Sequence, residues 1–194
     1  MNSVHTFPNS TALLIIDVQK GLDDPYYGIR CYPEAEQNMR RILAGWRDQK
    51  RPVVHVQHLS VNPESPLYPD KPGCAIKEEV QPVGGELLFQ KNVNSAFIGT
   101  GLEDYLKEQS IDTLLIVGLT TEHCVSTSVR MAANLGFDVW VVDDATAAFD
   151  CVDHTGTHHK AEDVHAISLA TLNGEFATVL RTEDVLLSVG YLSE

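Results

Sequence analysis

Short runs of aliphatic residues alternate along this chain with longer segments in which apolar residues recur at helical spacing. Runs of this length, with few charges inside them, are typical of β-strands that are buried on both faces. The pattern predicts strands at residues 11–17, 52–58, 86–91, 112–118, 137–144 and 176–180. It predicts helices at residues 34–49, 100–109, 124–136, 159–173 and 182–189. Strands and helices that alternate in this way form a parallel sheet covered on both faces, a three-layer α/β/α architecture.

The length and charge of the chain narrow its class further. Its 194 residues fit a single domain over residues 1–194. The formal net charge of −13 disfavours binding to nucleic acid or to an anionic membrane. We see no apolar run of membrane-spanning length and no secretory signal pattern. Four scattered cysteines without a CxxC pair indicate free thiols and a cytoplasmic location, although two disulfides are also compatible with the sequence.

Three reactive side chains follow predicted strands. Asp17 ends the first strand, Lys91 ends the third, and Cys124 opens the helix after the fourth. Ligands of open parallel sheets bind beyond the carboxyl ends of the strands, so we expect these side chains to meet there. A thiolate can attack a carbonyl carbon, a carboxylate can carry the proton, and an ammonium group can orient both. The start of the helix is also expected to lower the pKa of Cys124 and to supply N–H donors to an oxyanion.

Each of these residues has a simpler interpretation when it is considered alone. Asp17 could cap a turn, Lys91 could be a solvated surface lysine, and Cys124 could be a small buried apolar residue. Their joint placement at one edge of one sheet favours a catalytic set.

The same residues lie in four segments that resemble the isochorismatase-like cysteine hydrolases. The segments are "ALLIIDVQKGL", "FQKNVNSAFIGTGLEDYL", "LLIVGLTTEHCVSTSVRMAANLGFDVWVVDDA" and "HAISLATLNGEFATV". The resemblance runs from about Thr11 to Val179. It implies a Rossmann-like six-stranded parallel sheet of order 3-2-1-4-5-6. The strands that carry Asp17 and Cys124 would then flank the point where the strand order reverses.

The resemblance also implies specific roles and an assembly. The catalytic triad would be Asp17, Lys91 and Cys124, and the oxyanion hole would be formed by the N–H groups of Thr120 and Cys124. A cis peptide bond is implied between Leu119 and Thr120. Members of the family are generally homo-oligomers, so a dimer or a tetramer is expected, and no cofactor is implied.

The thiol narrows the chemistry within the family. Isochorismatases cleave a vinyl ether without a thiol, so Cys124 favours hydrolysis of the C–N bond of a small amide or ureide through a thioester. Nicotinamidases in the family carry an Asp-x-His metal motif after the second strand. Here "VHVQHLSVNPES" offers His55 and His58 without that motif, which favours a structural or substrate-lining role for His58 and no metal. The remaining histidines fit a loop-to-helix cap better than a zinc site: His154, His158, His159 and His165.

Three alternatives remain open at this point: a vinyl-ether hydrolase, a binding protein of the same fold that has lost catalysis, and a thiol redox protein. The last would lack an obvious resolving cysteine. If the chain is an amidase, the loops at residues 18–30 and 60–75 should line its substrate pocket. The expected lining residues are Gln19, Tyr26, Tyr68 and Phe97, whose mixed aromatic and polar character suggests a small planar amide.

Overall fold

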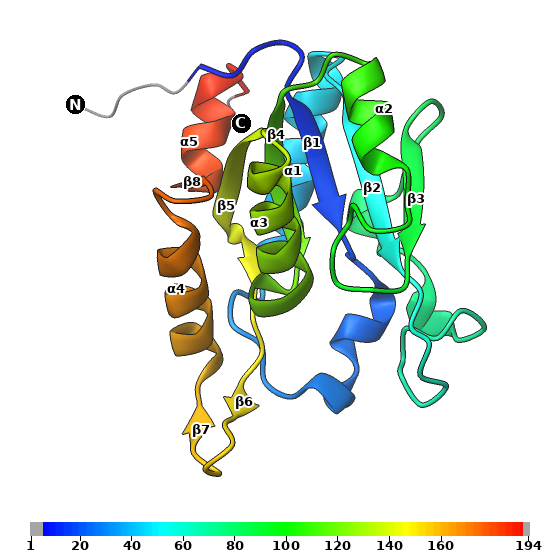
Figure 1. The fold of residues 1–194 in the computed structure, drawn as a ribbon, viewed down its shortest axis with the longest axis vertical. Coiled ribbons are helices and arrows are strands. Elements are labelled where there is room, and N and C mark those ends of the chain that lie inside the picture. Colours follow the sequence, from blue (N-terminus) through cyan, green and yellow to red (C-terminus); the bar gives the residue numbers. More distant parts are fainter. Residues whose placement is uncertain (1–5, 192–194) are drawn as a thin grey trace.

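The central sheet has six parallel strands in the order β3-β2-β1-β4-β5-β8 (Figure 1). The computed structural model describes residues 6–191. The strands are β1 (Ala12–Ile16), β2 (Val53–His58), β3 (Leu87–Lys91), β4 (Thr113–Leu119), β5 (Asp138–Ala147) and β8 (Thr178–Leu180). This order confirms the expected one, with β8 as its sixth strand. Within the described part of the chain, no helix is both long enough and apolar enough to cross a bilayer.

Helices cover both faces of the sheet and form two separate apolar cores (Figure 1). On one face lie α1 (Ala35–Asp48) and α5 (Thr182–Ser188), and on the other lie α2 (Leu102–Glu108), α3 (Ser126–Asn134) and α4 (Ala161–Leu172). Alternate residues of a strand point to opposite faces. In β1, Leu13 and Ile15 accordingly pack in the first core, and Leu14 and Ile16 pack in the second. The three-layer prediction is therefore confirmed.

The structure departs from the predicted elements around β5 and α3. Strand β5 extends to Ala147, and a short antiparallel hairpin follows it, formed by β6 (Cys151–Val152) and β7 (His158–His159). Figure 1 shows this hairpin beyond the carboxyl end of the sheet. The helix expected from Cys124 begins earlier, as a wide π-helical turn over Thr121–Val125 that leads into α3. Both departures lie at the edge where the reactive side chains were expected.

Gly118 brings the ends of β1 and β4 close together. It pairs with Ile16 in the sheet and has a φ of 132°. A Cβ atom at this position would lie 2.1 Å from the carbonyl oxygen of Ile16, so no larger residue fits without moving the backbone. The close approach holds the residue after β1 beside the turn that follows β4.

Candidate active site

Asp17 turns out of β1 at the carboxyl edge of the sheet. Its backbone N–H donates to the carbonyl oxygen of Val56 over 2.9 Å, and its φ is 54°, in the left-handed region. The side chain is buried. Its Oδ2 accepts a hydrogen bond from Lys91, whereas its Oδ1 has no hydrogen-bond partner among the described residues. One carboxylate oxygen of Asp17 therefore remains available to accept a proton.

Lys91 joins the other groups of the site. Its buried Nζ lies 2.5 Å from Asp17 Oδ2, 3.1 Å from His58 Nδ1 and 3.3 Å from Cys124 Sγ. Strand β3 pairs with β2 so that Lys91 lies opposite His58, which explains how the two side chains meet. The structure thus brings together the three residues that were expected to meet, and His58 joins them as an acceptor for the ammonium group.

The turn that carries Cys124 follows directly after β4. The peptide bond between Leu119 and Thr120 is cis. The carbonyl oxygen of Thr120 then accepts the Val125 N–H over 3.1 Å, which closes the wide turn around Cys124. Cys124 is partly buried and packs at the edge of the second core. The thiol therefore points toward Lys91 from a wide π-helical turn rather than from a regular α-helix.

Burial sets the protonation of the site. Desolvation raises the pKa of Asp17 above its ordinary value, although Lys91 opposes the shift. Desolvation, together with the charge of Asp17, also raises the pKa of the Cys124 thiol to about 12, again against the effect of Lys91. The expectation of a lowered pKa for Cys124 was therefore wrong for the ligand-free site, because burial and the charge of Asp17 outweigh the ammonium group. At neutral pH the thiol keeps its proton.

A cavity of about 650 Å³ opens onto Asp17 and Cys124. Aromatic rings form part of its wall: Tyr26 lies at 5.0 Å from Tyr27 and edge-on to it, and Tyr27 stacks on Phe149 at 5.5 Å between centroids. Glu122 and Asp150 also line the cavity. Of the four expected lining residues, only Tyr26 is among those that line it.

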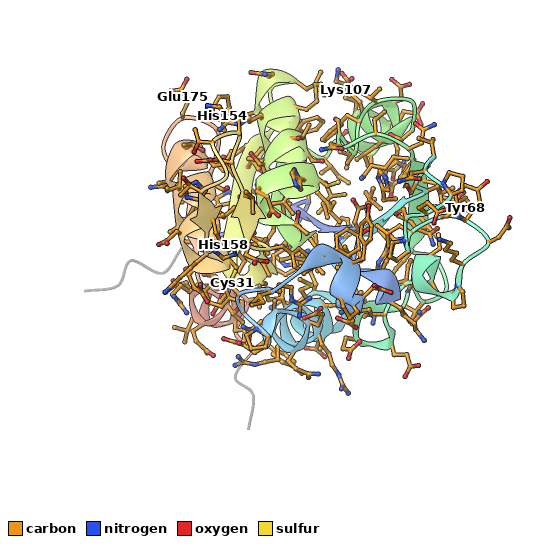
Figure 2. All side chains as sticks on the ribbon, turned by 90° about the horizontal axis from the view of Figure 1, so that it is seen from below. Cys31, Tyr68, Lys107, His154, His158 and Glu175 are labelled. Atoms are coloured by element: carbon orange, nitrogen blue, oxygen red, sulfur yellow. The ribbon has the colours of Figure 1, made fainter. Side chains whose placement is uncertain are left out.

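The other three expected lining residues lie elsewhere. The Gln19 side chain is buried in the protein, where it donates to the carbonyl oxygens of His58 and Cys74 and accepts from the His58 N–H. Phe97 stacks on Phe137 beside the second core. Tyr68 lies on the loop between β2 and β3 (Figure 2). Gln19 thus fixes the end of β2, which carries His58, instead of contacting a ligand.

Asp17, His58 and Cys124 are also the described residues whose ligand atoms could surround a metal ion, since these atoms lie within 4.8 Å of one another. The Lys91 ammonium group already lies 2.5–3.3 Å from each of these side chains. The ammonium group already supplies a positive charge at this point, and a metal ion would have to displace it. His55 contacts Glu86 at 2.7 Å instead, on the far side of β2 from this group.

The later histidines do not form the helix cap that was expected, because Lys160 is the residue that precedes α4. His158 and His159 lie on β7, where they bind Asp150 and Asp153, respectively. His165, in α4, is buried between two partners that the sequence did not reveal. Its ring contacts Thr121 Oγ1 at 2.9 Å and Asp143 Oδ1 at 2.8 Å.

This contact ties the turn that carries Cys124 to α4. Although burial opposes the charge, hydrogen bonds that the ring makes to Asp143 and Cys31 raise the pKa of His165 to about 9. The charged ring donates to Thr121, three residues before Cys124, and so holds the turn in position. His165 is the first residue of the segment "HAISLATLNGEFATV". No rule of sequence spacing predicts that its ring contacts Thr121.

Comparison with known proteins identifies the family. The Isochorismatase domain model matches residues 11–184. The chain belongs to the isochorismatase family. Among curated members, it is 49% identical over 175 residues to the uncharacterized isochorismatase family protein YrdC of Bacillus subtilis, covering 90% of this chain and 94% of YrdC. It is 28% identical over 205 residues to the maleamate amidohydrolase of Pseudomonas putida, covering 96% and 90% of the two chains.

The fold of the isochorismatase family is matched closely as well. A crystal structure from Chromobacterium violaceum that is assigned to this hydrolase family superposes with a TM-score of 0.94 at 41% identity. The match covers 99% of this chain and 100% of the other. The chain is therefore an isochorismatase-family hydrolase over nearly its whole length.

Proposed function

We propose that this isochorismatase-family hydrolase cleaves the C–N bond of a small amide or ureide through a thioester on Cys124. One observation carries the proposal. Lys91 Nζ is hydrogen-bonded to both Asp17 Oδ2 and Cys124 Sγ, while the other oxygen of Asp17 has no partner among residues 6–191. This is the arrangement that a thiol nucleophile needs beside a base that is already oriented.

In the first half of the reaction, the substrate carbonyl lies against Cys124 in the cavity. Asp17 takes the thiol proton on Oδ1 as the sulfur forms its bond to the carbonyl carbon, so a free thiolate need not accumulate. The developing oxyanion accepts hydrogen bonds from the N–H groups of Thr120 and Cys124. When the tetrahedral intermediate collapses, the C–N bond breaks, and Asp17 returns its proton to the leaving nitrogen.

In the second half, a water molecule attacks the thioester carbonyl while Asp17 takes one of its protons. The C–S bond then breaks, the acid is released, and the sulfur recovers its proton from Asp17. The raised pKa of Asp17 suits a group that must both accept and return a proton. Lys91 keeps the carboxylate oriented and offsets its charge throughout.

The relatives support an amide rather than an ether. The maleamate amidohydrolase of Pseudomonas putida, by its name, hydrolyses an amide, and it matches this chain over most of its length. The vinyl-ether alternative does not require the thiol. Cleavage that survives the loss of the Cys124 sulfur would therefore support the ether reaction or another chemistry that does not use a thiol.

The test measures ammonia release from a panel of small amides and ureides. The wild-type protein should release ammonia, and Cys124→Ala should not. Cys151→Ala is the matched control, because Cys151 is an exposed thiol at the same cavity and should not be needed. Mass spectrometry of the acid-quenched protein should find the acyl group on Cys124. Equal rates for wild-type protein and Cys124→Ala would refute the proposal.

A further inference from the structure

We infer that the cavity selects amides that carry an ammonium group and disfavours amides that carry a carboxylate. The inference rests on the proposed function and names the substrate class of the same site. Glu122 and Asp150 are thus assigned as residues that determine specificity for substrate charge.

Apart from histidines, the charged residues that line the cavity are acidic. Among the described residues that line it are three with carboxyl groups, Asp17, Glu122 and Asp150, and none of the lining residues is a lysine or an arginine. Lys91 is committed to Asp17, its partner at 2.5 Å. Burial lowers the pKa of His58 to about 4, so that ring is neutral at pH 7. A carboxylate on the substrate would therefore meet like charges with no fixed cation to bind it.

Glu122 has an oxygen without a partner. Its Oε1 accepts the Phe149 N–H at 3.3 Å, while its Oε2 is buried and has no hydrogen-bond partner in the described protein. The His123 ring lies 4.0 Å from Oε1. A buried carboxylate that lacks a counter-charge is costly, and a cation entering the cavity would reduce that cost. Glu122 lies two residues before the nucleophile, so its charge acts close to the reacting carbonyl.

Asp150 is a second carboxylate that lines the cavity. Its Oδ1 accepts the Ile29 N–H at 2.7 Å and its Oδ2 contacts His158 at 2.6 Å. Hydrogen bonds from His158 and Ile29 lower the pKa of Asp150, which keeps it ionised.

The aromatic wall is an independent observation in the same direction. Tyr26, Tyr27 and Phe149 form a run of adjoining rings along the cavity, with centroid separations of 5.0 and 5.5 Å. The faces of aromatic rings carry a negative quadrupole that attracts ammonium groups. Aromatic rings combined with carboxylates are the chemistry that recognises an organic cation, and both line the cavity that opens onto Cys124.

The test uses three amides of one shape and different charge: 4-(aminomethyl)benzamide, 4-methylbenzamide and 4-carbamoylbenzoate. We expect kcat/KM to be highest for the first and lowest for the last, with about tenfold or more between these two at low salt. The difference should shrink as salt is added. In Glu122→Gln the ratio should fall several-fold, because glutamine can keep the Phe149 bond but carries no charge. Glu175→Gln is the matched control, since this exposed residue lies between α4 and β8, away from the cavity (Figure 2).

Binding to Cys124→Ala, followed by calorimetry, separates this inference from the proposed function. The cationic amide should bind this variant more tightly than the anionic one even if no amide is turned over. If Glu122→Gln does not fold, as judged by circular dichroism, Asp150→Asn takes its place in the same assay. Equal or reversed affinities for the two charged amides would overturn the inference, as would the absence of measurable binding by the cationic amide. A charge preference that is unchanged in the folded variant would overturn the assignment to these carboxylates.

Discussion

Replacing both members of the Asp17–Lys91 pair should cost no more stability than replacing one of them alone. At the observed separation of 2.5 Å, two unit charges attract by about 7 kcal/mol at an effective dielectric constant of ~20. The cost of taking both charges out of water offsets much of that gain, so the intact pair adds little net stability. Lys91→Met or Asp17→Asn removes the attraction and leaves one buried charge uncompensated. Each single variant should therefore lose about 3–5 kcal/mol of unfolding free energy.

The double variant Asp17→Asn with Lys91→Met contains neither charge. Its loss should be no greater than that of a single variant, which gives a coupling free energy of about 3 kcal/mol or more. The unfolding free energies of the two single variants should also depend differently on pH. Without Lys91, the pKa of Asp17 rises further, and a carboxyl group whose folded-state pKa is raised loses stability as the pH rises through it. Lys91→Met should thus be less destabilised at pH 5 than at pH 8.

Urea unfolding of the four proteins at both pH values measures these quantities, with ammonia release followed in parallel. Under the proposed mechanism both residues serve the same thiol. Loss of either should then lower turnover by about 10²–10⁴-fold, and the double variant should be little worse than a single one. Stability losses that add to within about 0.5 kcal/mol would refute the reasoning, because the two side chains would then act independently.

Four further predictions concern the rest of the molecule. At pH 7, iodoacetamide should label the exposed Cys151 before Cys124, because the pKa of Cys124 is raised to about 12, and faster labelling of Cys124 would contradict this. Unfolding free energy should fall by up to about 3 kcal/mol between pH 6.5 and 9 as His165 loses its proton, and His165→Gln should remove that slope. Gly118→Ala should cost more than about 3 kcal/mol in urea unfolding, since its Cβ meets backbone; a cost below 1 kcal/mol would show that the strands can separate freely. Light scattering should give a multiple of 21.4 kDa, and a monomer mass would contradict the expected homo-oligomer.

The meeting of Asp17, Lys91 and Cys124 could be predicted because it depends on topology. Parallel strands end at one edge of the sheet, and each of these residues stands at or just after the end of a strand. Their spacing along the chain is irrelevant once the strand order is known. His58 could be placed at the same edge by the same logic, as the last residue of β2, but its role as an acceptor for Lys91 depends on the register between β2 and β3.

The cavity wall could not be predicted in this way, because loops form it by contacts between distant residues. Gln19 lies in the 18–30 loop, which was expected to line the cavity. Its amide instead bonds to Cys74, 55 residues away. Phe149 and Asp150 line the cavity because β5 continues past its predicted end to Ala147, and the chain then runs along the cavity. Neither contact has a signature in the local sequence.

The pKa of Cys124 was predicted in the wrong direction for an instructive reason. A helix start and a lysine are local features that can be inferred from sequence, and both favour a thiolate. The depth of burial and the charge of Asp17 are properties of the packed site, and together they outweigh the effect of Lys91. Under the proposed mechanism this result has a chemical use. A thiol that is protonated at rest is a poor target for oxidants and alkylating agents, and it becomes a nucleophile only when a carbonyl lies close enough for Asp17 to take the proton during attack. The site would then couple activation of the sulfur to the presence of substrate.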